Sequence, residues 1–385
     1  MTKIKVYLVC TGVGIINRGI ETFARECFDG LKNVEGLDIT LFKGAGEEKE
    51  KEKILWNISR NGELAPLLGK FIKRNGYVVE QLSSFLPFVK AIRQGNPDLI
   101  FYSDSNLGFQ LYRWRQQIGV PYKLLFSNGG PCSPPFDRTN FVHQVSPLYH
   151  QQALQAGESP DKHILVPYGI NIPQDYLFLN PEEIQNLRQK LGLPLDRKIV
   201  ISVGAIDPNS HKRMDYVINE IATIPEPHPY LVLLGHIPPE GQSIIEQAHC
   251  QLGSDNFTAR SVSYQEVNQY YQVADIFTLA SLSEGFGRVF LEALMHGLPC
   301  IVHDYPVMRY VLGSHGTFID LSIQGNLSDG LSRLLKNHSN SHEQKIKRRQ
   351  YVENTFSWTT LAPKYLKMFH HCLNVPALSE NTSKS

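Results

Sequence analysis

Short apolar runs alternate with helix-like segments along almost the whole chain, and this alternation restricts the fold more than any other feature. In the first half of the chain, the apolar runs predict strands at Lys5–Cys10, Asp38–Phe42, Asp98–Tyr102 and Lys123–Phe126. The segments between them predict helices at Ile20–Leu31, Leu82–Arg93 and Gly108–Ile118. The apolar runs are continuous rather than alternating, which indicates a parallel sheet covered by helices on both faces.

A second series of the same kind follows the loop Pro167–Pro173. It predicts strands at Ile199–Val203, Tyr230–Leu234, Ile276–Leu279 and Cys300–His303. It predicts helices at Asp215–Ile221, Ser243–Cys250, Glu266–Gln272 and Arg288–His296. Each series is long enough for its own doubly wound sheet, and 385 residues suit two domains. We expect the domain boundary near Ile172–Asn180.

The composition excludes several classes of protein. Basic and acidic residues balance at 38 to 37, so charge gives no reason to expect nucleic-acid binding. Six scattered cysteines contain no C-x-x-C pair, which argues against a zinc or redox motif and indicates reduced thiols in a cytosol. The apolar stretch Val6–Ile16 is interrupted by Gly12 and Gly14, so a first strand with a glycine turn explains it better than a signal peptide.

No run reaches the roughly 18 apolar residues that a membrane-spanning helix needs, so we expect a cytoplasmic protein. Lys70, Lys73 and Arg74 stand among apolar residues and are compatible with peripheral contact at the inner face of a membrane. The alternative is an ordinary amphipathic helix whose basic residues face solvent. The polar tail Pro376–Ser385 is expected to be flexible.

The segment Ser283–Leu294 holds the most informative motif. It follows an expected strand and opens a helix, and Gly285 and Gly287 let backbone amides approach a ligand closely. A helix start carries unpaired N–H groups and partial positive charge, which suits a phosphate. Glu284 precedes that start and Glu292 lies about one helical turn inside it, as suits a ligand that pairs a phosphate with hydroxyl groups. The alternative is an ordinary helix start with Glu292 on an exposed face.

This segment resembles the E-x7-E motif of the retaining glycosyltransferases of family GT4, with Glu284 and Glu292 as the two acids. The following Gly297–Val302 resembles the G-x-P-V-V strand entry of that family. Further pieces match in chain order, namely Arg18–Glu21, Val166–Ile170, Val203–Gly204 with His211–Arg213, and Phe356–Trp358. The resemblance therefore spans nearly the whole chain.

The resemblance implies the GT-B architecture, an α/β fold of two Rossmann-like doubly wound domains that face a cleft. Residues 1–172 would form the acceptor-side domain, with a C-terminal helix at about 357–375 packing back on it. Residues 173–356 would bind the nucleotide-sugar, and 376–385 would be a flexible tail. The implied reaction moves a hexose from a UDP- or GDP-sugar to a hydroxyl of a glycan, a lipid-linked or a small-molecule acceptor, with retention of configuration.

The resemblance also implies roles for single residues. Glu292 would bind the ribose hydroxyls and Glu284 the donor sugar, while amides around Gly287–Val289 would face the diphosphate. Lys212 matches the family lysine. A cation there would stabilise the departing diphosphate. The alternative interpretation of this segment is a basic helix start that faces solvent. The other expected donor-binding residues are Gly19, Gly204, Arg213, Gly285, Phe286 and Arg288.

Two positions depart from the family pattern. Ala205 stands where members usually carry arginine, and Arg213 is the candidate to replace that charge. The loop Ser127–Pro131 lacks the histidine that many members place near the sugar, which leaves the catalytic base open. Asp104 is a candidate because it follows a strand at the carboxyl edge of the sheet. Asp137 and His143 are weaker candidates, and the leaving phosphate itself is another.

No D-x-D pair occurs in the sequence, so we expect neither a metal nor another cofactor; Lys212 and helix amides would neutralise the charge instead. The loop from Thr11 to Gly19 does not fit G-x-G-x-x-G, because Asn17 occupies the third glycine position, which argues against a nicotinamide dehydrogenase. Two alternatives stay open: a nucleotide-sugar epimerase or hydrolase of the same fold, and a non-catalytic sugar-nucleotide-binding subunit.

Overall fold

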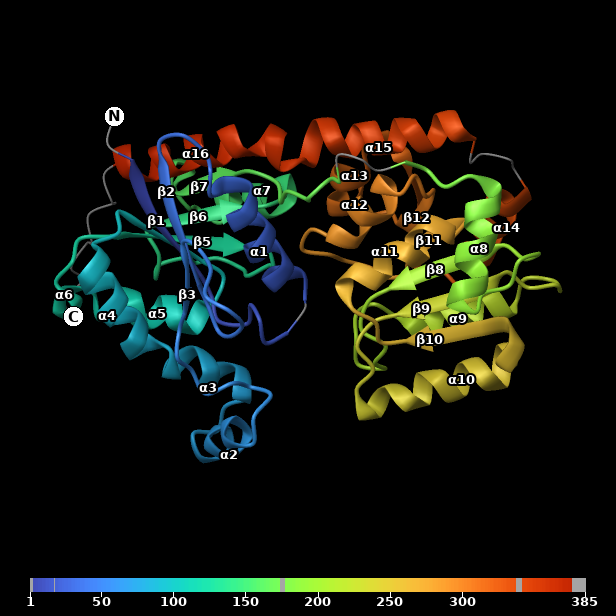
Figure 1. The fold of residues 1–385 in the computed structure, drawn as a ribbon, viewed down its shortest axis with the longest axis horizontal. Coiled ribbons are helices and arrows are strands. Elements are labelled where there is room, and N and C mark those ends of the chain that lie inside the picture. Colours follow the sequence, from blue (N-terminus) through green and yellow to red (C-terminus); the bar gives the residue numbers. More distant parts are fainter. Residues whose placement is uncertain (1–2, 17, 174–176, 337–340, 376–385) are drawn as a thin grey trace. The chain divides into compact units, whose positions relative to one another are not determined.

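The computed structural model describes residues 3–16, 18–173, 177–336 and 341–375 (Figure 1). The chain divides into two compact units. The N-terminal unit comprises Met1–Asn171 and Phe356–Ser385, and the C-terminal unit comprises Ile172–Thr355. Two expectations concern residues outside the described ranges. They are the flexible tail at 376–385 and Asn17, which occupies the third glycine position of G-x-G-x-x-G.

The N-terminal unit is built on a seven-stranded parallel sheet with the order β3-β2-β1-β4-β5-β6-β7. Its strands are β1 Ile4–Cys10, β2 Leu37–Lys43, β3 Glu52–Ile54, β4 Leu99–Tyr102, β5 Lys123–Asn128, β6 Phe141–Gln144 and β7 His163–Leu165. From β1 the chain first moves outward to β3 and then returns to β4 on the other side of β1. The strand order therefore reverses between β1 and β4, and ligands of such sheets bind at this point, beyond the carboxyl ends of the strands.

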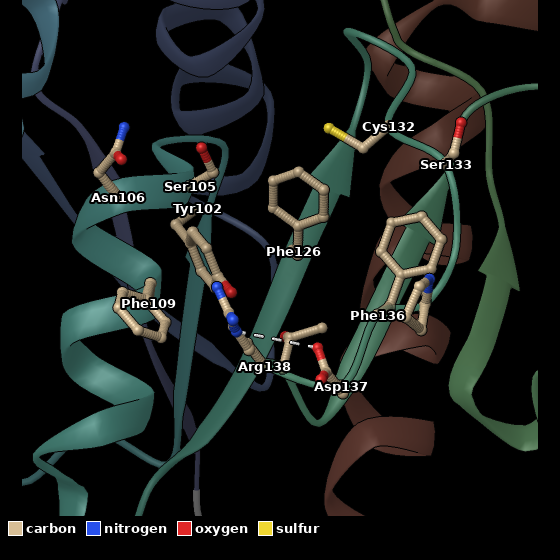
Figure 2. Close-up of a pocket in the computed structure, with 12 residues that line it drawn as sticks. Tyr102, Ser105, Asn106, Phe109, Phe126, Cys132, Ser133, Phe136, Asp137 and Arg138 are labelled. Carbon is tan, nitrogen blue, oxygen red and sulfur yellow. Dashed lines mark ion pairs between the residues drawn. The ribbon is translucent and has the colours of Figure 1, made fainter. Parts of the chain in front are cut away.

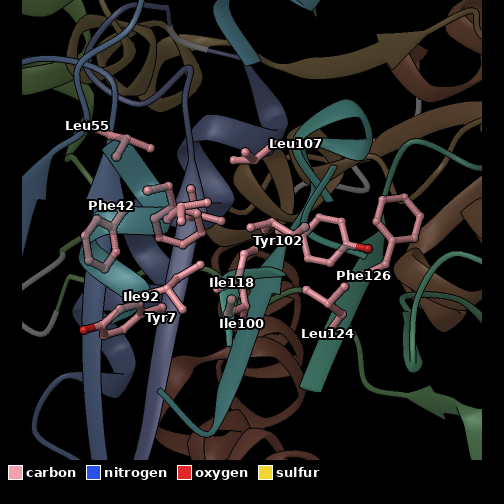
Figure 3. Close-up of a cluster of buried hydrophobic side chains, with 14 of the residues drawn as sticks. Tyr7, Phe42, Leu55, Ile92, Ile100, Tyr102, Leu107, Ile118, Leu124 and Phe126 are labelled. Carbon is pink, nitrogen blue, oxygen red and sulfur yellow. The ribbon is translucent and has the colours of Figure 1, made fainter. Parts of the chain in front are cut away.

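Helices connect these strands. They are α1 Gly19–Leu31, α2 Leu64–Phe71, α3 Gly76–Ser83, α4 Phe85–Gly95, α5 Ser105–Arg113, α6 Arg115–Ile118, α7 Pro147–Gln155, the 3-10 turn Pro160–Lys162 and α16 Trp358–Asn374. The rings of Tyr7, Phe42 and Phe88 pack together in tilted and edge-on arrangements, with centroids 4.6–6.3 Å apart. They belong to a buried apolar cluster of this unit, in which Figure 3 labels Tyr7 and Phe42. Helix α16 also packs on this sheet, where Phe369 meets Phe101 with ring centroids 5.8 Å apart.

The C-terminal unit holds a six-stranded parallel sheet with the order β10-β9-β8-β11-β12-β13. Its strands are β8 Ile199–Val203, β9 Tyr230–Leu234, β10 Phe257–Arg260, β11 Ile276–Leu279, β12 Cys300–His303 and β13 Gly316–Ile319. Its helices are α8 Pro181–Leu191, α9 Met214–Ala222, α10 Gln242–Leu252, α11 Tyr264–Val273, α12 Arg288–Met295, α13 Pro306–Leu312, α14 Asn326–Lys336 and α15 His342–Phe356, with 3-10 turns at Pro239–Gly241, Ser254–Asn256 and Gly313–His315. This is the Rossmann strand order, and its reversal lies between β8 and β11.

The predicted fold class, two doubly wound α/β sheets, is confirmed, and the four strands expected in the C-terminal unit have the observed bounds. The single helix expected at Leu82–Arg93 is wrong, because α3 ends at Ser83 and α4 starts at Phe85. The buried Ser84 hydroxyl between them donates to the Gln81 carbonyl at 2.8 Å. Among the residues that the structure describes, no helix has the length and apolarity to cross a membrane.

Candidate functional site

The loops after β8 and β11 meet at the switch point of the C-terminal sheet. These two strands are neighbours, with Val200 beside Ile276. Lys212 follows β8, Glu284 follows β11, and the Nζ of Lys212 lies 2.5 Å from the Oε1 of Glu284. The two side chains are only 18% and 7% exposed. The topology therefore joins the expected phosphate lysine to the first acid of the motif.

Gly204 makes room for this lysine. A Cβ atom at Gly204 would lie 2.9 Å from Cγ and 3.3 Å from Cδ of Lys212. The Gly204 amide donates to the Leu234 carbonyl at 2.8 Å, which fixes the backbone at the end of β8. The expected donor-binding glycine thus has a structural explanation: without a side chain, it lets the Lys212 stem lie against the chain.

The Glu284 carboxylate is held in its ionised form. Burial alone would raise its pKa, but the His211 ring 3.6 Å from Oε1 and the Lys212 ammonium outweigh burial and lower the pKa to about 2. His211 itself is well exposed. The site therefore combines a buried negative charge with one half-buried and one exposed basic group.

Helix α12 starts four residues after Glu284, and the residue directly before the helix is a glycine. Gly287 precedes the helix with φ +79°, and a Cβ there would lie 2.3 Å from the Phe290 ring. Both the dihedral angle and the close ring require glycine. The side chains of Phe286 and Arg288 are buried, whereas Gly285 and Val289 are half-buried. This arrangement favours backbone amides over side chains as ligand-binding groups at this helix start.

Glu292 lies further along α12 and is buried, so the alternative of an exposed helix-face residue is wrong. The Tyr264 hydroxyl donates to Oε1 at 3.4 Å, and the Tyr271 hydroxyl donates to Oε2 at 3.3 Å. Burial and Glu292 raise the pKa of Tyr271, which keeps its hydroxyl protonated. The two tyrosines are functional candidates that the motif did not identify, because they lie on α11 and Glu292 lies on α12.

Arg213, the candidate replacement for the missing family arginine, has a left-handed backbone with φ +52° ahead of α9. Its Nη1 donates to the carbonyl oxygens of Ala280 at 3.3 Å and Leu321 at 2.9 Å. The guanidinium also lies over the Tyr216 ring at 4.2 Å. The side chain therefore braces the loops that follow β11 and β13.

The switch point of the N-terminal sheet holds Asp104, which is 1% exposed. Its Oδ2 accepts the Thr11 amide at 2.6 Å, and its Oδ1 accepts the Tyr77 hydroxyl at 3.1 Å. Burial raises its pKa. Asp104 therefore links the Thr11 backbone to Tyr77. The catalytic role expected for Asp104 stays a prediction.

A basic and acidic cluster surrounds this position. Arg60 lies over the Tyr77 ring at 4.0 Å, 3.8 Å from Glu21 and in an ion pair with Glu80. A Cβ at Gly12 would lie 2.3 Å from Oε1 of Glu21, so the glycine after β1 admits that carboxylate. Gly19 is the first residue of α1, and a Cβ there would meet no atom of the described residues within 4 Å. Packing within the chain therefore does not require glycine at that position.

The two weaker base candidates lie in different environments. His143 is fully buried; its Nε2 is 2.7 Å from the Val166 carbonyl, its Nδ1 is 3.1 Å from the Ser127 hydroxyl, and burial lowers its pKa to about 4. These contacts indicate a structural role. Asp137 is 71% exposed, forms a 4.0 Å ion pair with Arg138 and lines a cavity.

That cavity has a volume of about 460 Å³ and lies between α5, β5 and the loop 129–140 of the N-terminal unit (Figure 2). Figure 2 shows Phe109, Phe126 and Phe136 around it, with Ser105 and Asn106 at the start of α5 and Arg138 near Asp137. The Arg138 guanidinium lies over the Phe109 ring at 4.4 Å. The cavity thus offers apolar ring faces together with polar and charged groups.

Within the described ranges, no group of three or more His, Cys, Asp or Glu side chains is arranged to hold a metal ion.

Residues 183–357 match the family model described as "Glycosyl transferases group 1". The D-inositol 3-phosphate glycosyltransferase of Corynebacterium urealyticum is 25% identical over 207 residues, which cover 50% of this chain and 47% of that protein. The chain spans about a third to three fifths of the length of the first curated relatives.

Solved structures are similar over almost the whole chain. A glycosyltransferase from Rickettsia africae ESF-5 matches with a TM-score of 0.73 and 16% identity, covering 97% of this chain and all of that one. The Anabaena protein Alr3699/HepE in complex with UDP and glucose matches with a TM-score of 0.71 and 16% identity, covering 95% and 99%. These matches show that the fold, two Rossmann-like units, is that of the GT-B glycosyltransferases. Within this fold, residues 183–357 of the chain carry the match to the glycosyl transferases group 1 family.

Proposed function

We propose that this chain is a retaining glycosyltransferase that moves a hexose from a UDP- or GDP-sugar to a hydroxyl group of a glycan, a lipid-linked or a small-molecule acceptor. The observation that carries the proposal is the Lys212–Glu284 ion pair at the switch point between β8 and β11. As the bond between the anomeric carbon and the diphosphate breaks, negative charge grows on the diphosphate. A lysine held in a partly dry site stabilises that charge more in the transition state than in the ground state.

Glu284 has two proposed tasks. Its carboxylate holds Lys212 in place now, and the family resemblance assigns it the donor sugar as well. The first-turn amides of α12, from Gly287 to Val289, would share the diphosphate charge with Lys212. The site then neutralises the leaving group with groups that are already in position, which reduces the reorganisation needed during the reaction.

Glu292 is the proposed ribose ligand. Its two oxygens already accept the hydroxyls of Tyr264 and Tyr271. We assign the tyrosines a positioning role, since they hold the buried carboxylate in one orientation for two neighbouring ribose hydroxyls.

For the proton of the acceptor hydroxyl, we propose the leaving diphosphate as the base. The acceptor oxygen forms the new bond to the anomeric carbon on the face that the diphosphate leaves, and its proton passes to a diphosphate oxygen. The contacts of Asp104 and His143 support this choice, because both side chains are already engaged within the protein.

A UDP-sugar is the first donor to test. Support comes from the Anabaena protein of the same fold, whose structures contain UDP, UDP with glucose, and UDP-glucose. The proposal includes no metal, because the sequence has no D-x-D pair and because Lys212 and the α12 amides can neutralise the diphosphate.

The cavity beside α5 is the proposed acceptor site. Aromatic faces such as Phe109 and Phe126 suit the apolar face of a sugar ring, and Asn106, Asp137 and Arg138 offer hydrogen-bonding groups to its hydroxyls. We expect Phe109→Ala to raise the acceptor KM while the affinity for UDP stays as in the unsubstituted chain. An unchanged acceptor KM would place the acceptor elsewhere.

Two experiments test the function itself. Thermal unfolding with a panel of nucleotide-sugars identifies the donor, because a ligand that binds the folded state raises its apparent stability. Product analysis with that donor then separates the possibilities: transfer to an added acceptor supports the proposal, conversion of the free donor indicates an epimerase or hydrolase, and binding without turnover indicates a non-catalytic subunit.

A further inference from the structure

Helix α2 (Leu64–Phe71) buries its small residues and exposes its large ones. Ala65 and Gly69, one turn apart, are buried where α2 packs against α3. A Cβ at Gly69 would lie 2.4 Å from the Arg74 carbonyl oxygen, and a Cβ at Gly76 would lie 3.4 Å from the Ala65 Cβ. The face toward the protein is therefore lined with small residues that allow close approach. Figure 1 shows α2 beyond α3, away from the sheet of its own unit.

The opposite face carries an apolar stripe. Leu64, Leu67, Leu68 and Phe71 are 63%, 62%, 41% and 87% exposed. Their spacing of i, i+3, i+4 and i+7 puts them on one side of a helix, the pattern that normally packs into a core. Here the stripe faces solvent. Contiguous exposed apolar side chains of this size mark a surface that binds a partner or a membrane.

Basic residues accompany the stripe. Lys70 lies within α2, and Lys73 and Arg74 follow it; all three are exposed. The segment 64–75 contains no Asp or Glu, so its charge is entirely positive. Exposed Leu and Phe side chains with cations beside them are complementary to a bilayer, which has an apolar interior and can have negatively charged headgroups.

We propose that this patch, made of Leu64, Leu67, Leu68, Phe71, Lys70, Lys73 and Arg74, docks the protein on an anionic lipid bilayer. The apolar stripe enters the boundary between headgroups and acyl chains, and the three cations contact anionic headgroups. The proposal concerns the segment 64–74 alone and does not depend on the proposed transfer reaction.

The test is sedimentation of the full chain with vesicles of phosphatidylcholine and with vesicles that also contain phosphatidylglycerol. We expect binding to the anionic vesicles only, weakened between ~0.1 M and ~1 M salt as the Debye length falls from ~10 Å to ~3 Å. Leu67→Ser with Phe71→Ser should lower the partition coefficient at least about tenfold. Lys70→Gln with Lys73→Gln should lower it by more than about tenfold, at roughly fivefold per cation.

Matched controls come from the same unit. Leu86→Ser removes an apolar side chain that is 72% exposed on α4, and Lys90→Gln with Arg113→Gln removes two exposed cations outside the patch. These variants should bind anionic vesicles as the unsubstituted chain does. Unchanged binding of both patch variants, loss of binding in the controls, or no binding of the unsubstituted chain would overturn the proposal. A dimer that Leu67→Ser with Phe71→Ser turns into a monomer, without vesicle binding, would overturn it in favour of a second copy.

Discussion

The Lys212 ammonium lies 2.5 Å from Oε1 of Glu284, although 72 residues separate the two in sequence. The strand order creates this pair, since the chain leaves β8, builds β9 and β10 on one side and returns to β11 on the other. Gly204 gives the lysine stem its place, and α12 begins four residues beyond the glutamate. A cation, a helix start and a buried carboxylate thus meet at the carboxyl edge of one sheet.

The ion pair predicts a pH dependence of stability. The folded-state pKa of Glu284, about 2, is below its ordinary value of 4.5, so the carboxylate stabilises the fold above pH 4.5 and this contribution is lost as the pH falls toward 2. This difference between the two pKa values corresponds to roughly 3 kcal/mol of stability. We expect the melting temperature of Glu284→Gln to fall less between pH 4.5 and 2 than that of the unsubstituted chain. Glu182 is exposed, so the melting temperature of Glu182→Gln should fall with pH as that of the unsubstituted chain does. If the melting temperature of Glu284→Gln also fell in parallel, the lowered pKa of Glu284 would be contradicted.

Substitution of the two motif glutamates should have different effects on nucleotide binding. Glu292→Ala removes the proposed ribose contact and should weaken UDP or GDP binding by roughly tenfold, because a hydrogen bond to a charged group contributes about 1.5–3 kcal/mol. Glu284→Ala removes the proposed donor-sugar contact, so it should lower turnover of the sugar donor by a larger factor than it changes nucleoside diphosphate affinity. Titration calorimetry with the free nucleoside diphosphate measures the affinity of both variants, and initial rates with the sugar donor measure their turnover. Equal affinity in Glu292→Ala and the unsubstituted chain would rule out the ribose role.

Arg213 should affect stability as well as catalysis. Because Nη1 donates to the carbonyls of Ala280 and Leu321, Arg213→Ala is expected to lower the free energy of unfolding by about 1–3 kcal/mol. If Arg213 also replaces the arginine missing at Ala205, turnover at saturating donor should fall with it. Denaturant unfolding and initial rates on the same sample separate the effects. A stability equal to that of the unsubstituted chain would contradict the bracing role.

Activity should persist in excess EDTA. Lys212 and the α12 amides supply the positive charge that a metal would otherwise bring to the diphosphate. The measurement is the transfer rate with EDTA and after addition of Mg²⁺ or Mn²⁺. Complete loss in EDTA, restored by either ion, would refute the metal-free mechanism.

Much of the fold was predictable because continuous apolar runs identify buried parallel strands. The bounds of β8, β9, β11 and β12 follow directly from such runs. Two of the missed strands have weaker patterns: β3 is three residues long and starts with Glu52, while β6 includes the polar His143 and Gln144, which the fold buries. A polar residue in a short strand carries no apolar signal, so only the assembled sheet reveals it.

The candidate site was predictable in part for a related reason. Local spacing identified Glu284, Glu292 and the glycines, since these residues share one strand-to-helix connection. Local spacing could not show that Tyr264 and Tyr271 hold Glu292, because they lie on a separate helix. Nor could it show that Arg213 binds two carbonyls, since both acceptors lie on loops more than sixty residues away.

The most direct test of the proposed chemistry is turnover at saturating donor by Lys212→Ala, with Lys198→Ala as a control for an exposed lysine of the same unit. Losing a charge-assisted contact of about 1.5–3 kcal/mol to the leaving diphosphate should lower turnover at least about tenfold, since each 1.36 kcal/mol is a factor of ten. Lys198→Ala, whose side chain is 62% exposed, should keep the original rate. We expect transfer of the sugar to the acceptor to slow in Lys212→Ala while the fold is retained; full turnover in that variant would contradict the leaving-group role of Lys212.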